Sequence, residues 1–385
     1  MMFVKNVGEI QMKKACRFII PIIIFCIFST TYVVAEEILS TKAKIIQVQA
    51  DIESCTYDEY VEKISKTEES IADLETQLQQ AMDEKKAAEE AGDEYGIMRA
   101  EAIISSCNEQ LVELRKLLSD YKLQRNLAYY YVENRDALVA RETTTIEYQI
   151  YDLQLQCALL NYQKNYLNSL ISQCEEQVRI EEVKYAQGYS TQLLVEEQKT
   201  LLQQAKTQFE IADERQKLIR EQLAIYGGVE REENPGDETG EIKEDYQEHF
   251  LSSSMNYARL KNQISSYENF VAELSEDDEK YKKASLQLDL CRLNKQQYES
   301  DLKNYILQIK QNYADAKKNA SCVETEIALQ NKRIQTNETL FENGKITQIK
   351  ITEQKTELKR LEYEKMRYIY EANKYYYILD KAIEN

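Results

Sequence analysis

The sequence contains very few of the residues that allow a chain to turn. It has 9 Gly, 2 Pro and no Trp in 385 residues, whereas an average chain of this length would have roughly 27 Gly and 19 Pro. β-Sandwiches, β-barrels and doubly wound α/β folds need a turn every 8 to 12 residues, approximately, or a glycine-rich phosphate loop. The composition argues against all of them. What remains is an all-α chain built from a few very long helices.

The residues that form most catalytic and metal sites are also scarce. The only histidine is His249, and none of the eight cysteines belongs to a C-x-x-C pair, so the usual zinc-binding patterns are missing. No nucleophile, base and orienting group occur at a spacing that suggests a reaction. We therefore expect no enzymatic activity, no metal and no cofactor.

The charge is strongly of one sign. The formal net charge is −18, although residues 1–35 carry four basic residues and one acidic residue, a local +3. The remainder of the chain therefore carries −21, since +3 and −21 give the total. A surface this acidic repels phosphate backbones, which argues against nucleic acid as a partner.

The amino terminus resembles an export signal. Basic residues at 13–17 precede an apolar run at 18–28, and the small residue Ala35 ends the segment, as in a signal peptide that occupies residues 1–35. An uncleaved anchor over 18–35 is the alternative, at the short end of the ~17–25 residues that span a bilayer. In both cases we expect the body of the chain outside the cytoplasm, in the cell envelope, where it could associate with a membrane.

Helix-breaking residues in the rest of the chain gather at one place. Residues 227–245 hold four Gly, the second Pro and eight acidic residues, a composition typical of an exposed linker. The sequence on either side is rich in Glu, Lys, Leu, Gln and Ala, which favour helix. We expect a first helical-hairpin repeat over 36–226, the acidic linker over 227–245, and a second helical-hairpin repeat over 246–385.

The two parts are related by an internal duplication. A shift of 156 residues places GYSTQLLVEEQKTLL, which begins at Gly188, over GKITQIKITEQKTEL, which begins at Gly344, with eight identities in 15 positions. The apolar residues follow the same shift at alternating spacings of three and four. Such spacings average ~3.5 residues, the period of helices that pack side by side as coiled coils.

A helix with one apolar stripe needs a partner, so each repeat is expected to fold back on itself. The stripe restarts after Gly188 and Gly344, and glycine is the residue that most easily takes a positive φ after a helix. Ser190, Thr191 and Thr347 then become candidate N-caps of the returning helices. The sequence predicts two tandem antiparallel hairpins with arms of about 65 residues, close to 100 Å.

Each repeat also needs a turn at the end away from Gly188 or Gly344, and the sequence indicates this turn more clearly in the second repeat than in the first. In the second repeat, the acidic cluster at 275–279 is the nearest break before Gly344. In the first repeat, Gly92 and Gly96 indicate one position for the turn. The similarity of 104–114 to 264–274 indicates another, at 119–122. The sequence leaves these two positions open.

Six cysteines follow residue 35, an even number that would allow disulfides in an exported chain. Cys157 and Cys174 cannot pair with each other, because 17 residues span roughly 25 Å along one helix. We interpret the cysteines as small core residues.

Two short segments carry a resemblance to a known family. They are YAQGYST at 185–191 and FENGKIT at 341–347, each with an aromatic residue, a glycine and a hydroxyl residue at the same spacing. Together with the signal peptide and the doubled hairpin, they resemble the TolC-like outer membrane efflux proteins. The likeness covers most of residues 100–226 and 250–385.

This resemblance implies a homotrimer whose helices form a hollow α-barrel. The hairpin tips would meet a periplasmic adaptor protein that belongs to an inner-membrane pump, and cargo would leave through the bore to the outside. The family also inserts strand pairs into the outer membrane. Neither 90–125 nor 272–285 has the long apolar and polar alternation that such strands need, so we expect these strands to be reduced or absent.

The resemblance also implies roles for particular residues. The adaptor-docking tips would comprise Gly188, Tyr189, Ser190, Thr191, Gly344, Lys345, Ile346 and Thr347. In the family an acidic residue just beyond the second tip narrows the pore. Glu353 matches it best, with Glu196 and Glu197 as counterparts in the first repeat. Lys350 stands where the family would place another acid, a departure from the pattern.

Two other functions fit parts of the sequence. A structural coiled-coil spacer of the cell envelope needs heptads, but it needs neither a lumen nor matched tips. The hairpin adaptor of the same pump systems needs a β domain rich in Val and Gly beside a single hairpin, whereas here the hairpin is doubled and that composition is absent. The duplication favours the duct, because matched ends suggest that both hairpins meet the same kind of partner.

Overall fold

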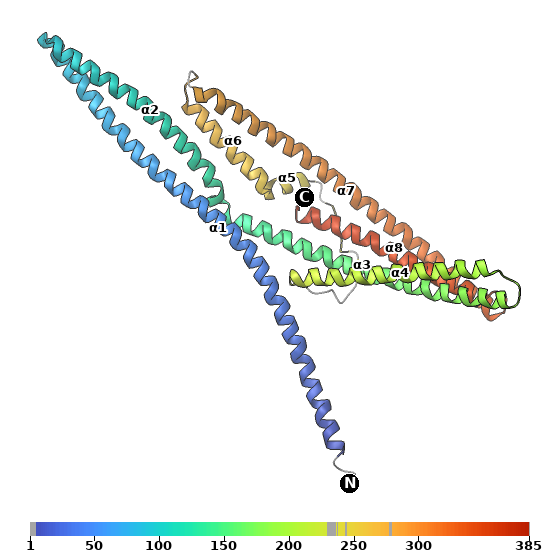
Figure 1. The fold of residues 1–385 in the computed structure, drawn as a ribbon. Coiled ribbons are helices and arrows are strands. Elements are labelled where there is room, and N and C mark those ends of the chain that lie inside the picture. The colour runs from blue at the N-terminus through green and yellow to red at the C-terminus, as the bar shows by residue number, and fades with distance from the viewer. Residues whose placement is uncertain (1–4, 229–235, 237, 243–244, 277–278, 385) are drawn as a thin grey trace. The chain divides into compact units, whose positions relative to one another are not determined.

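The fold is all helical. A computed structural model describes residues 5–228, 236, 238–242, 245–276 and 279–384, with side chains from residue 44 onward. These residues form eight α-helices and no strand (Figure 1), which confirms the expected fold class. Within the described residues, no helix is both long enough and apolar enough to cross a bilayer. The predicted signal peptide lies in the part whose side chains are outside this description.

The helices follow one another with short turns over most of the chain. Their bounds are α1 Lys5–Ala91, α2 Glu94–Glu133, α3 Arg135–Ala186, α4 Gln192–Ile225, α5 Tyr246–Ser253, α6 Met255–Glu273, α7 Glu279–Glu342 and α8 Gln348–Asp380. At ~1.5 Å per residue, the 64 residues of α7 extend about 96 Å, the arm length expected from the sequence. The other three arms are shorter than expected, with 52 residues in α3, 34 in α4 and 33 in α8.

The chain divides into two compact units. Unit 1 contains Met1–Lys42, Thr143–Tyr246 and Tyr305–Asn385, and unit 2 contains Ala43–Glu142 and Gln247–Asn304. Each unit therefore includes helices from both sides of the acidic segment 227–245.

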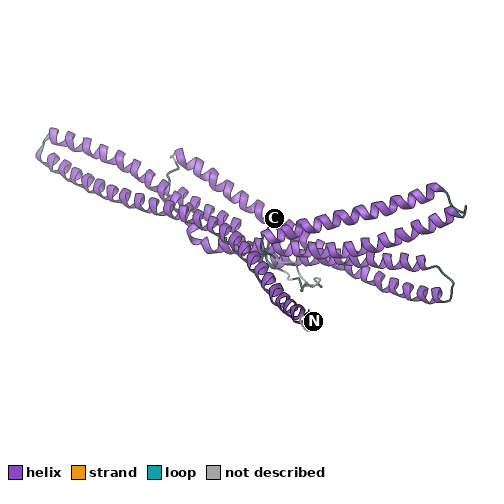
Figure 2. Ribbon diagram, turned by 60° about the horizontal axis from the view of Figure 1, so that its bottom comes forward, coloured by secondary structure: helices purple, strands orange, loops and turns teal. Residues whose placement is uncertain are grey.

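In unit 1 the helices pack in the order α4, α3, α8, α7, and Figure 2 shows the four running side by side. The first contact is the coiled-coil seam between α3 and α4, which buries the apolar residues Cys157, Leu160, Leu167, Ala212, Ile219 and Leu223. Their spacings of three, four and seven reproduce the stripe seen in the sequence. The predicted pairing of these two helices is thus the pairing in the structure.

The central contact of unit 1 joins the two repeats through α3 and α8. The rings of Tyr151 and Tyr377 stack with centroids 4.6 Å apart. The Tyr370 hydroxyl donates to Asp152 at 2.8 Å, and burial raises the pKa of Tyr370. On the other side, α8 packs on α7 through a cluster of Tyr313, Ala316 and Ala372. The hairpins are therefore fused along their inner helices.

The described residues of segment 227–245 lie on unit 1 and are fixed to it by their backbone. The Asn373 side chain, only 1% exposed, donates to the carbonyl of Gly236 at 2.9 Å and accepts from the backbone N–H of Glu238 at 3.1 Å. The Tyr313 hydroxyl donates to the carbonyl of Gly240 at 3.1 Å. Composition alone did not reveal these anchors, because they come from residues far along the chain.

In unit 2 the order of packing is α1, α2, α6, α7. Arg115 on α2 pairs with Glu75 on α1 at 2.8 Å. Ser119 on α2 donates to Glu273 on α6 at 2.9 Å. Arg292 on α7 pairs with a carboxylate of α6 at 2.8 Å. A small core of Leu123, Phe270 and Ala284 lies between α2, α6 and α7.

The turn left open in the first repeat lies at Gly92. This residue has φ +72° and separates α1 from α2, whereas residues 119–122 lie inside α2. Asp93 caps α2 by accepting from the N–H of Gly96 at 3.0 Å. The corresponding turn of the second repeat lies between α6 and α7, at the acidic cluster, as expected.

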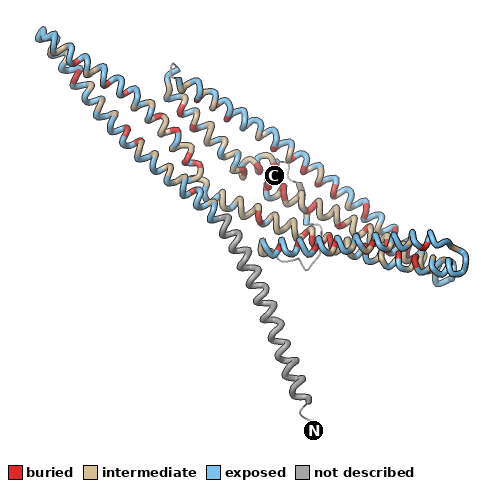
Figure 3. Tube along the Cα trace, viewed as in Figure 1, coloured by how far each residue is buried: buried red, intermediate tan, exposed pale blue. Residues whose placement is uncertain are grey.

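Burial follows the seams between helices (Figure 3). All six described cysteines are free thiols. Four of them fill seams, namely Cys107, Cys157, Cys174 and Cys291, and two are exposed, Cys55 and Cys322. The interpretation of the cysteines as core residues therefore holds for the first four.

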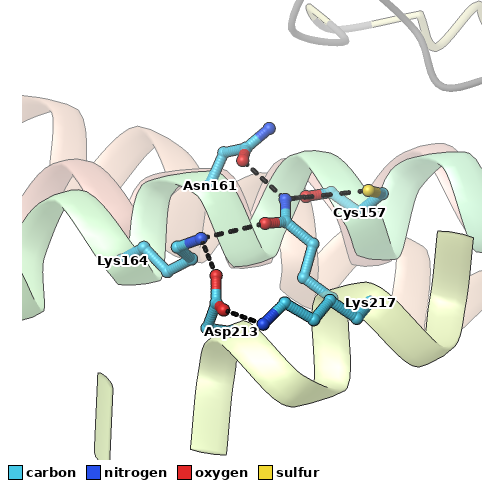
Figure 4. Close-up of polar contacts among 6 residues, drawn as sticks. Cys157, Asn161, Lys164, Asp213 and Lys217 are labelled. Carbon is cyan, nitrogen blue, oxygen red and sulfur yellow. Dashed lines mark hydrogen bonds and ion pairs between the residues drawn. The ribbon is translucent and has the colours of Figure 1, made fainter. Parts of the chain in front are cut away.

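A polar cluster interrupts the apolar seam between α3 and α4 (Figure 4). Gln216 is 1% exposed, and its amide donates to Asn161 at 2.6 Å and accepts from Lys164 at 3.2 Å. Lys164 also forms an ion pair with Asp213, which Lys217 approaches at 2.8 Å. A buried polar group that finds its hydrogen-bond partners at only one position along a seam destabilises any arrangement in which one helix is shifted along the other. This cluster therefore fixes the register of α3 against α4.

The charges in this cluster generate a prediction about pH. The hydrogen bonds from Lys164 and Lys217 lower the pKa of Asp213 from 3.8 to about 2. Because the folded pKa lies below the unfolded one, Asp213 stabilises the fold above pH 3.8, and this contribution is lost as the pH falls through about 2. We expect the free energy of unfolding of Asp213→Asn to decrease less than that of the unmodified chain over this interval, as measured by urea unfolding.

The neighbouring exposed Glu214 provides the control. Glu214→Gln should retain the full acid-induced decrease in the free energy of unfolding. If Asp213→Asn also retained it, the ion pairs at Asp213 would not be linked to folding.

Candidate functional site

The first tip is the turn between α3 and α4, and it is closed by two backbone hydrogen bonds. The N–H of Gly188 donates to the carbonyl of Tyr185 at 3.0 Å, and the N–H of Tyr189 donates to that of Lys184 at 2.8 Å. This is the Schellman arrangement, which requires a residue with positive φ just after the helix. Gly188 takes φ +76°.

The second tip, between α7 and α8, repeats the same arrangement 156 residues later. The N–H of Gly344 donates to the carbonyl of Phe341 at 2.8 Å, and the N–H of Lys345 donates to that of Leu340 at 2.9 Å. Gly344 has φ +69°. The chain therefore reverses at both glycines, as the two-hairpin fold requires.

The three N-cap candidates behave differently. Thr191 is the N-cap of α4, and its hydroxyl accepts from the N–H of Leu194 at 3.3 Å. Thr347 occupies the same position before α8 but makes no side-chain capping bond. Ser190 does not cap α4, because its hydroxyl donates to Glu181 on α3 at 2.8 Å.

Glu181 connects the end of α3 to the turn of the first tip, a role that was not predicted from the sequence. Its carboxylate pairs with Lys184 at 2.6 Å and accepts from Ser190, and these two bonds lower the pKa of Glu181. The i, i+3 spacing of Glu181 and Lys184 is a sequence signal for the first contact. The second contact depends on the turn, so only the folded chain reveals it.

The three acids expected at a pore constriction lie behind the tips. Glu196 and Glu197 are exposed on α4. Glu353 on α8 is partly exposed and pairs with Lys350 at 3.0 Å, so the basic residue that departs from the family pattern compensates its charge. Among the described side chains, no three acidic, histidine or cysteine groups gather closely enough for a metal.

Both tips lie at the same end of unit 1, as Figures 1 and 2 show. Behind them, the Thr356 hydroxyl of α8 donates to the carbonyl of Ser169 on α3 at 3.2 Å. The Gln330 side chain of α7 donates to the backbone of α8 at 3.0 Å. These bonds lie behind the tips: the first joins the two hairpins, and the second joins α7 to α8.

Comparison with known proteins agrees with this architecture. No family model and no curated protein matches the sequence. Among solved structures, CusC, studied for transmembrane channel formation, matches with a TM-score of 0.50 and 9% identity over 84% of this chain and 95% of CusC. The chain has a TolC-like fold. The resemblance inferred from the two tips is thereby confirmed for the fold.

An outer membrane protein and an outer membrane channel match with lower scores. VceC from Vibrio cholerae has a TM-score of 0.49 and 11% identity over 68% of this chain and 74% of VceC. CmeC from Campylobacter jejuni has a TM-score of 0.46 and 10% identity over 69% of this chain and 67% of CmeC.

The tip glycines generate a prediction about stability. We expect Gly188→Ala and Gly344→Ala each to lower the free energy of unfolding by about 1–2 kcal/mol, because a Cβ is disfavoured at positive φ. The cause would be the backbone alone, since a Cβ at either position would meet no heavy atom within 4 Å. Asparagine, which tolerates this conformation, should cost less. Urea unfolding measures the difference.

Gly236 provides a matched control. A Cβ there also meets nothing within 4 Å, and the residue does not take positive φ. Gly236→Ala should change the free energy of unfolding by less than about 0.5 kcal/mol. Equal losses at all three glycines would refute the conformational explanation.

Proposed function

We propose that this chain is the duct component of a tripartite export system. Three copies would form an α-helical channel of the outer membrane and periplasm, and the tips at Gly188 and Gly344 would dock a periplasmic adaptor protein of an inner-membrane pump. The doubled tip carries this proposal, because unit 1 presents the same turn twice at one end. The TolC-like fold supports it by analogy.

The edges of unit 1 support assembly into a ring. The outer helix α4 exposes the large apolar residues Leu201, Ile211, Leu218 and Ile225, which are 47–59% exposed. The last three are seven residues apart. The outer helix α7 exposes a seven-residue series of mostly small side chains, namely Leu307, Ala314, Ser321 and Ala328. Apolar heptads on exposed faces are typical of helices that pair with another helix.

The two edges match in register when the tips of neighbouring copies are level. Leu218 lies 30 residues after Gly188, and Ala314 lies 30 residues before Gly344. By the same measure, Ile211 stands level with Ser321 of the next copy. The helices would run antiparallel with large side chains opposite small ones, as knobs-into-holes packing prefers.

A contact between two different edges is heterologous, and repeating it closes a ring when the rotation between copies divides a full turn. The family resemblance implies three copies in that ring. In it, three copies each of Glu196, Glu197 and Glu353 would surround the bore roughly 13 Å behind the tips, given their distance of 8 or 9 residues from the glycines. Glu353 would contribute less negative charge, because Lys350 compensates it.

The edge contact generates a prediction about oligomeric state. We expect residues 36–385 to sediment as a trimer at micromolar concentration and Leu218→Glu to sediment as a monomer, because the substitution places a charge in an apolar seam. Gln203→Glu, on the same helix but off the stripe, should remain trimeric. A stable monomer or two-stranded dimer of the unmodified chain would instead favour the structural coiled-coil spacer.

The register generates a second prediction. With exposed Cys55 and Cys322 replaced by serine, the pair Leu218→Cys and Ala314→Cys should oxidise to a covalent trimer on a denaturing gel. The control pair is Leu218→Cys with Ala328→Cys, displaced by 14 residues, or about 21 Å. It should remain monomeric on the gel. Equal yields from the two pairs would contradict the proposed seam.

A further inference from the structure

The two tips share one backbone geometry but differ in surface chemistry. The 156-residue shift places Tyr189 over Lys345 and Leu194 over Lys350. Two apolar positions of the first tip are therefore basic in the second. Backbone geometry alone would make the tips interchangeable to a partner, so any discrimination between them depends on these side chains.

The first tip is an exposed apolar surface. Four large apolar side chains lie within ten residues of one another: Tyr185 is 48% exposed, Tyr189 81%, Leu193 68% and Leu194 43%. Single exposed apolar residues are ordinary, but a group of this kind marks an interaction site. The acids beside it are already paired, Glu181 within the tip and Glu182 with Lys199 at 3.0 Å.

The second tip presents a cation. Lys350 pairs with Glu353, and Lys355 pairs with Glu338 at 2.8 Å. Lys345, exposed at the turn itself, has no acidic side chain within ion-pair distance among the described residues, although Glu342 lies three residues earlier in the chain. In a protein whose net charge is −18, an uncompensated lysine at a docking end attracts an acidic partner group.

We propose that the protein docking at this end places an apolar side chain on Tyr189 and Leu193 of the first tip and a carboxylate on Lys345 of the second. This rests on the proposed function, in which an adaptor docks at the tips. The apolar contact supplies most of the affinity, and the charge contact supplies orientation and rate of association. Because the two tips have the same backbone geometry, a partner that recognised the backbone alone could place the same segment on either tip. The difference in side chains selects one of them.

Cross-linking of the full chain in intact cells tests this arrangement. A carbodiimide activates a carboxylate, an amine in direct contact displaces it to form an amide, and the carbodiimide leaves as a urea that has taken up the elements of water. It should link Lys345 to an Asp or Glu of a second polypeptide, identified by mass spectrometry of the joined peptides. Lys345→Arg retains the charge but cannot form this amide, so the product should disappear in that variant.

A photoreactive benzophenone residue tests the position of the partner. Gln187 and Asn343 are both exposed and correspond under the 156-residue shift. Benzophenone at these positions should capture two different peptides of the same polypeptide that the carbodiimide captures. In Lys345→Glu we expect at least a tenfold lower yield at both positions. Thr207, exposed on α4 away from the tips, serves as the control position and should capture neither peptide.

Each other outcome has a separate meaning. Capture of the same peptide at both benzophenone positions would overturn the proposed difference between the tips. Capture of a polypeptide by benzophenone without any carbodiimide product at Lys345 would overturn it as well. In both cases docking at the tips would stand. Capture of a second copy of this chain at the tips overturns the proposed partner. If neither reagent captures a polypeptide at either tip although the trimer forms, tip docking fails and the ring remains.

Discussion

The structure depends on one constraint: each long helix has a single apolar stripe that it cannot bury alone. The stripe forces α3 to pair with α4 and α7 with α8, and the reversal in each case needs a residue that accepts positive φ. The inner helices α3 and α8 then use a second face to join the repeats through tyrosines and Asp152. The outer helix α4 has no such neighbour among the described residues of unit 1, and Ile211, Leu218 and Ile225 lie exposed on it.

The two tips share one backbone arrangement and differ in the side chains that it carries. At the level of Gln216 the first seam holds a satisfied polar cluster, whereas the equivalent position in the second seam is Ala372 and its neighbour Asn373 binds the acidic segment. At the tips, the Schellman hydrogen bonds are the same in both repeats, while Tyr189 and Leu194 of the first tip correspond to lysines in the second. The backbone features are the same at both tips because few residues can satisfy them, whereas exposed side chains are less constrained.

Much of this architecture could be predicted from the sequence, because its signals are local or periodic. The scarcity of Gly and Pro, the stripe and the repeated glycines at Gly188 and Gly344 each act within one or two helical turns. The position of the far turn in the first repeat could not be decided, since Gly92 and residues 119–122 offered comparable signals. Ser119 is buried against Glu273 on α6, a contact 154 residues apart in the chain.

By itself, then, the sequence determined that the chain is helical, that it reverses at two equivalent glycines and that it carries a repeated tip. The tertiary structure alone decided that α3 packs on α8, that Asn373 anchors the acidic segment and that Ser190 serves Glu181 rather than capping α4. The physical reason is that periodicity shows a helix needs a partner but does not identify it. Partners are selected by shape, charge and hydrogen bonds between residues that only the folded chain brings together.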